Sequence, residues 1–88
     1  MKETTPDHSF TLYPNPAKDI LNVRFDKMIT QPFLAEIINA EGQKVLTVNM
    51  DRVQDSYTIN ISQLQHGIYS IKITSEREFV TRKFIIGK

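Results

Sequence analysis

Hydrophobic and polar residues alternate along most of the chain with a period of two, and no segment holds a helical period over eleven residues. The clearest case is Ile20–Phe25, where Leu21, Val23 and Phe25 are separated by polar side chains. Ser56–Ile61 shows the same alternation. Because side chains of a strand point to opposite faces in turn, this pattern predicts strands with one buried and one solvated face.

Seven short segments of this kind follow one another, about ten residues apart. They are Ser9–Leu12, Ile20–Phe25, Phe33–Asn39, Lys44–Met50, Ser56–Ile61, Ile68–Thr74 and Phe79–Ile86. Such spacing predicts an all-β fold, an immunoglobulin-like antiparallel β-sandwich of about seven strands. A small β-barrel is the alternative architecture.

Turn residues separate the segments. Pro14-Asn15-Pro16 must end the first strand, because each proline lacks a backbone N–H. Gly42 predicts a tight turn before Lys44–Met50, since glycine adopts positive φ at little cost. Apolar residues at positions 45, 46, 48 and 50 leave the buried face of that strand ambiguous.

Leu64, Gly67 and Tyr69 have the spacing of a tyrosine corner. In such a corner the ring fills the edge of the core, and its hydroxyl satisfies an upstream backbone carbonyl. We therefore expect Tyr69 to pack at the corner. For Tyr13, the other tyrosine of the motifs, we expect packing in the core.

The chain has 88 residues and no cysteine, which indicates one domain and excludes a disulfide scaffold, a thiolate metal site and a cysteine nucleophile. Residues 1–8 are polar and predict a linker, or residues added for expression, ahead of a domain at 9–88. They contain no apolar stretch of the kind that forms the centre of a signal peptide.

The net charge of +1 is unevenly placed. Residues 1–71 carry six basic and eight acidic residues, whereas residues 72–88 carry five basic and two acidic ones, a balance of +3. This pattern is typical of a solvated strand face with a basic tail, and it contains too few basic residues to predict nucleic-acid binding.

Candidate catalytic chemistry is sparse. His8 falls in the predicted linker and His66 on a corner, and neither has metal-ligand spacing. Acid pairs bracket two segments and leave calcium binding as an alternative: Asp51 with Asp55, and Asp19 with Asp26. With no nucleophile elbow and no phosphate loop, we expect no catalytic residue, no metal, no cofactor and no small-molecule substrate.

Four motifs occur in a fixed order along almost the whole chain: residues 12–17 (LYPNPA), 37–45 (IINAEGQKV), 59–71 (INISQLQHGIYSI) and 81–86 (TRKFII). Together, over residues 9–88, they resemble the C-terminal sorting domain of cargo proteins of the type IX (Por) secretion system of the Bacteroidetes.

The resemblance implies a function. Such a domain is a signal at the C-terminus of a larger exported protein, and it directs that cargo from the periplasm to the outer-membrane translocon. A sortase-type cysteine protease usually removes it, and the cargo is released or joined to anionic lipopolysaccharide at the cell surface. The expected partners are therefore the translocon and this protease.

The resemblance also implies site residues. The family motifs place Tyr13, Pro14, Asn15 and Pro16 in the first motif, Gly42 in the central turn, and Gly67 and Tyr69 in the corner. The terminal motif places recognition by the secretion machinery at Arg82, Lys83, Phe84, Ile85, Ile86 and Lys88. The usual ending of the family is an apolar pair flanked by lysines, and this chain departs from it because Gly87 stands before Lys88. We expect this strand to pair with its receptor by strand addition, with Arg82 and Lys83 setting the register.

Two other interpretations stay open. One is an immunoglobulin-like or fibronectin-like accessory module that binds carbohydrate or protein, although the absence of tryptophan disfavours it. The other is a homodimer formed through exposed edge strands, which is compatible with sorting.

Overall fold

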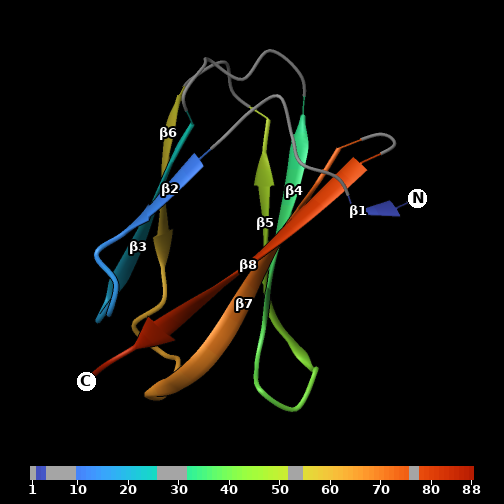
Figure 1. Ribbon diagram of the computed structural model, residues 1–88. Helices are drawn as coiled ribbons and strands as arrows, with labels where there is room; N and C mark the ends of the chain where they lie inside the picture. The colour runs from blue at the N-terminus through green and yellow to red at the C-terminus, as the bar shows by residue number, and fades with distance from the viewer. Residues whose placement is uncertain (1, 4–9, 26–31, 52–54, 76–77) are drawn as a thin grey trace.

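The computed structural model describes residues 2–3, 10–25, 32–51, 55–75 and 78–88, and these residues form eight strands in two layers (Figure 1). The strands are β1 (Lys2–Glu3), β2 (Phe10–Tyr13), β3 (Ile20–Phe25), β4 (Phe33–Ile38), β5 (Lys44–Met50), β6 (Ser56–Asn60), β7 (Gly67–Thr74) and β8 (Glu78–Ile86). All seven predicted strands are present, and no strand end differs from its predicted position by more than one residue. The two-residue strand β1 was not predicted, and it lies within the segment expected to be a linker.

The two layers are a five-stranded sheet in the order β1-β8-β7-β4-β5 and a three-stranded sheet in the order β2-β3-β6. Every strand pair is antiparallel except β1 with β8, which is parallel. Because the strands form two separate sheets, the immunoglobulin-like sandwich is confirmed and the barrel alternative is wrong. None of the described segments forms a helix long and apolar enough to cross a membrane.

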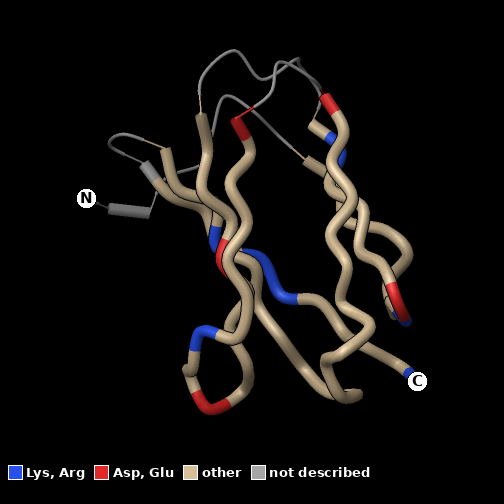
Figure 2. The backbone as a smooth tube through the Cα atoms, turned by 180° about the vertical axis from the view of Figure 1, so that it is seen from behind, with Lys and Arg blue, Asp and Glu red and all other residues tan. Residues whose placement is uncertain are grey.

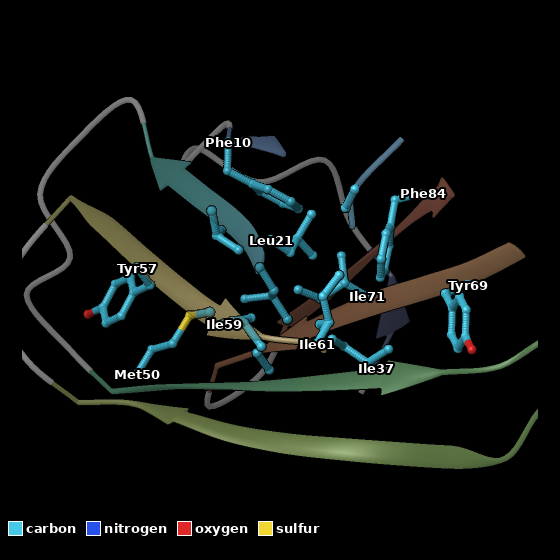
Figure 3. Packing of buried hydrophobic residues seen from close by; sticks show 14 of the residues in the cluster. Phe10, Leu21, Ile37, Met50, Tyr57, Ile59, Ile61, Tyr69, Ile71 and Phe84 are labelled. Carbon is cyan, nitrogen blue, oxygen red and sulfur yellow. The ribbon is translucent and has the colours of Figure 1, made fainter. Parts of the chain in front are cut away.

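The core lies between the sheets and receives alternate side chains from both (Figure 3). Leu21 and Val23 of β3 are fully buried, and so is Ile71 of β7 in the other sheet. Burial of one such side chain stabilises the fold by about 1.5–3 kcal/mol. The remaining buried members are Phe10, Ala17, Phe25, Ala35, Ile37, Met50, Tyr57, Ile59, Ile61, Tyr69, Ile73, Phe84 and Ile86.

A β-bulge resolves the ambiguous face of β5. Ile37 of β4 pairs with Leu46, but the next residue of β4 pairs with Lys44, so Val45 is the extra residue and is 37% exposed. Beyond the bulge the alternation is regular, and Leu46 and Val48 are half-buried towards the core while Met50 is fully buried.

The β4–β5 turn is held by Asn39. Its side-chain oxygen accepts hydrogen bonds from the backbone N–H of Glu41 at 3.0 Å and of Gln43 at 2.9 Å. Gly42 completes the turn with φ of +87°, a conformation that other residues adopt only with strain. The predicted tight turn is therefore confirmed.

Candidate functional site

The last strand, β8, divides the predicted recognition residues between two faces. Phe84 and Ile86 are each 1% exposed and lie in the core. Lys83, Ile85 and Lys88 are exposed. Because successive side chains of a strand alternate, Phe84 and Ile86 point inward while Ile85 points outward. Recognition of these residues by the secretion machinery stays a prediction.

Arg82 is half-buried and serves the fold. Its guanidinium donates a hydrogen bond to the backbone carbonyl of Phe10, and it lies 4.0 Å from the centroid of the Phe10 ring. A guanidinium over a ring face is attracted by the π electrons. Arg82 therefore fastens β8 to β2 of the opposite sheet, so this side chain is less accessible to a receptor than the neighbouring Lys83.

The Pro-Asn-Pro loop binds the outer edge of β8. The backbone N–H of Ala17 donates to the carbonyl of Ile85 at 2.8 Å, and the N–H of Gly87 donates to the carbonyl of Ala17 at 2.8 Å. The side-chain oxygen of Asn15 accepts from the N–H of Ile85 at 3.0 Å. These bonds form a short parallel bridge between Ala17 and Ile86. The first and last motifs, some 70 residues apart in sequence, thus form one unit.

Gly87 is explained by this unit. A Cβ atom at position 87 would lie 3.0 Å from Cβ of Pro16, closer than ordinary carbon contacts. Glycine therefore allows the Pro16 ring to approach the chain here. The next residue, Lys88, donates from Nζ to the carbonyl of Ser62 at 2.6 Å and so ties the chain to the corner motif.

The tyrosine corner is confirmed. The hydroxyl of Tyr69 donates to the carbonyl of Gln65 at 2.8 Å, and the residue is only 8% exposed. Its ring stacks on Phe84 with centroids 5.9 Å apart (Figure 3). Gly67 lies within this corner, where an added Cβ would be 3.8 Å from the Tyr69 ring. The corner motif therefore supports the inward face of the same strand whose edge the first motif binds.

Tyr13 differs from its prediction. It is 41% exposed, so the expectation that it packs in the core is wrong. Tyr13 pairs with Asn22 of β3, and the alternation along β2 turns Leu12 towards the core instead. Pro14, Asn15 and Pro16 are likewise exposed, which leaves the surface of the loop accessible.

One exposed apolar pair lies beside these residues. Ile68 of β7 is 53% exposed and Ile85 of β8 is 45% exposed, and the strand register places them opposite each other. Lys83 lies on the same face of the sheet, opposite Ser70. Figure 2 shows basic residues along the strand that leads to the C-terminus. We call Ile68, Lys83, Ile85 and Lys88, with Asn15 at their edge, the terminal surface.

The sequence did not single out Ile68 and Ala17, although both belong to this site. The sequence does contain a signal for an exposed apolar site at Ile68. This residue is apolar at an outward position of a strand whose inward residues are already apolar. Ala17 had none, because its contribution is a backbone N–H and carbonyl.

Other candidate residues form no comparable site. His66 lines a cavity of about 440 Å³ between the β4–β5 turn and the β6–β7 corner, together with Asn39 and Glu41. No group of three or more His, Asp or Glu residues within the described ranges could hold a metal ion. His8 and Asp26 lie outside those ranges.

Comparison with protein families gives a match over most of the chain. A family model described as "Secretion system C-terminal sorting domain" matches residues 11–87. A search of curated proteins found no match. The matched range contains the loop, the corner and all but the last residue of the terminal surface.

Proposed function

The chain belongs to the family of secretion system C-terminal sorting domains, and from this premise we propose that its folded terminal surface is what the secretion machinery recognises. The observation that carries the proposal is the convergence of the first motif, the corner motif and the terminal motif on one strand end. Motifs that are distant in sequence but joined in space point to a folded signal rather than to a linear peptide.

Family membership indicates a C-terminal sorting signal of the type IX secretion system. A domain of this kind is a signal and not a catalyst. It implies interaction with the type IX machinery, and it implies a secreted protein destined for the outer membrane or the cell surface. The activity of any attached cargo resides outside these residues.

The proposed route has four steps. The cargo reaches the periplasm, the domain delivers it to the outer-membrane translocon, and a sortase-type cysteine protease then cuts at or upstream of residues 1–8. The cargo is released or joined to anionic lipopolysaccharide. An accessible cleavage site requires an unpaired chain, so the cut is expected outside the short pairing of Lys2–Glu3 with β8, and the polar composition of residues 1–8 supports a cut in or before this segment.

The exposed face of β8 is better placed to bind a receptor than the backbone edge of the strand at Ile85. Strand addition at that position would first break two hydrogen bonds, the one that the N–H of Ile85 donates to Asn15 and the one that the carbonyl of Ile85 accepts from Ala17. The exposed side chains of Ile68, Ile85 and Lys83 need no such rearrangement. We therefore expect a receptor with an apolar pocket for the two isoleucines and acidic groups that face Lys83 and Lys88.

Fusion to a reporter tests the proposal. Residues 1–88 are joined to an exported fluorescent protein in a bacterium with a type IX system, and surface fluorescence is compared with periplasmic fluorescence. We expect the fusion to reach the surface, and we expect a fusion lacking residues 84–88 to stay in the periplasm. Periplasmic retention of the complete fusion would contradict the assignment, and surface delivery of the truncated fusion would contradict the role of the terminal surface.

A further inference from the structure

Strand β5 is an edge strand whose protection against pairing, among the described residues, is a bulge at Val45 near its start. It ends the five-stranded sheet, with β4 as its one neighbour among the described strands. Residues 45–50 contain no charge and no proline, and Lys44, the one charged residue of the strand, is held by Glu36 at 2.7 Å. Natural edge strands are commonly blunted by charges, prolines, bulges or covering loops. The bulge at Val45 lies outside residues 46–48, so this uncharged part of the edge remains a template for another strand.

The apolar side chains of β5 are also incompletely covered. Val45 is 37% exposed, and Leu46 and Val48 are only half-buried although they face the core. A cavity of about 240 Å³ borders this edge and is lined by Val45 and Leu46 of β5 and by Asn60, Gln63 and Leu64 at the end of β6 and after it. The half-buried state of Leu46 and Val48 shows that the inward face of β5 is partly open.

We propose that β5 pairs with β5 of a second copy of this chain, antiparallel about a twofold axis at Thr47. This register places Leu46 opposite Val48 twice, so inward-facing apolar residues meet inward-facing apolar residues. The same patch serves both partners, as an isologous interface requires. The two sheets would then join into one continuous sheet of ten strands, since each copy contributes five.

The other uncharged edge strands, β2 and β6, are weaker candidates. Phe10 of β2 is already 3% exposed, and Tyr57 and Ile59 of β6 are 8% and 2% exposed, so pairing there would bury little more of these side chains. The place of β5 in the sheet also favours it. β5 lies at the opposite end of the sheet from β8 and β1, so a β5 dimer leaves the terminal surface and the N-terminal strand accessible. The inference does not rest on the proposed sorting function.

Sedimentation of the intact chain tests the dimer. We expect the apparent mass of the wild-type chain to rise from 10.2 kDa towards twice that value over a roughly hundredfold concentration range. Thr47→Lys should remain monomeric, because two lysines would lie directly opposite each other at the axis. A lysine at position 47 would face Glu36 within each copy, so the monomer should keep its fold.

Thr58→Lys is the matched control, since Thr58 is the central exposed residue of β6. We expect it to dimerise like the wild type, and thermal melts establish that both variants are folded. A wild-type chain that stays monomeric at every concentration would overturn the proposal. A Thr47→Lys variant that dimerises as the wild type does, or a Thr58→Lys variant that alone becomes monomeric, would overturn it as well.

The register has its own test, because the chain contains no cysteine. A short bifunctional thiol reagent should cross-link Thr47→Cys efficiently into a dimer and Thr58→Cys poorly, since only the former places its two thiols beside the axis. Equal cross-linking of the two variants would contradict the proposed pairing.

Discussion

Replacement of Tyr69 by phenylalanine removes one hydroxyl and leaves the ring in place. That hydroxyl donates to the carbonyl of Gln65 at 2.8 Å in a partly buried position. The carbonyl loses this donor in the variant, while the ring still stacks on Phe84. A neutral hydrogen bond of this kind contributes about 0.5–1.5 kcal/mol, so we expect Tyr69→Phe to lower the free energy of unfolding by about 1 kcal/mol.

Urea denaturation followed by circular dichroism measures this difference. With a slope of about 1–2 kcal/mol per molar urea, the midpoint should fall by about 0.5–1 M. The melting temperature should fall by about 4–8 °C, as is usual for a domain of this size losing about 1 kcal/mol. The slope itself should not change, because the surface exposed on unfolding is nearly the same.

Tyr13→Phe is the matched control, since Tyr13 is 41% exposed and solvent can replace contacts of its hydroxyl. Its unfolding midpoint should stay within error of the wild type. The assignment of the corner fails if Tyr69→Phe is as stable as the wild type, or if Tyr13→Phe loses as much stability.

Four further substitutions probe the end of the chain and the loop that binds it. In urea denaturation, Phe84→Ala should destabilise the domain by about 3–5 kcal/mol, whereas Ile85→Ala should destabilise it by under about 1 kcal/mol. Equal losses would contradict the division of β8 into a buried and an exposed face. Asn15→Ala should cost about 1 kcal/mol and accelerate hydrogen exchange at the Ile85 amide, and unchanged exchange would contradict the hydrogen bond. Gly87→Ala should lower the free energy of unfolding by about 1–3 kcal/mol in the same assay, because the added methyl group would press against Pro16. Unchanged stability would show that the two residues do not approach closely.

The strands were predictable because the signals for them are local. Alternation in Ile20–Phe25 and Ser56–Ile61 follows directly from a sheet with one solvated face. The corner was predictable for the same reason, since Leu64, Gly67 and Tyr69 lie within six residues of one another. The buried face of β5 was not, because the bulge at Val45 depends on the register with β4.

The site depends on contacts that no local pattern contains. The bridge between Ala17 and Ile86 is made by backbone atoms, which are the same in every residue apart from proline. Tyr13 was misplaced because an aromatic residue next to a strand stop fits either face until the pairing with Asn22 fixes it. Phe84 and Ile86 were assigned to recognition because motif membership does not separate the inward residues of a strand from the outward ones.

The central claim is that the secretion machinery recognises the folded terminal surface. The most direct test compares surface delivery of a fused reporter for two double variants of equal stability. One variant carries Ile68→Ser with Ile85→Ser in the terminal surface, and the other carries Ile20→Ser with Val45→Ser, which are exposed aliphatic residues elsewhere. We predict that the first stays in the periplasm although it melts as the second does, and that the second reaches the cell surface like the wild type. Equal delivery of the two variants would contradict recognition through the folded terminal surface.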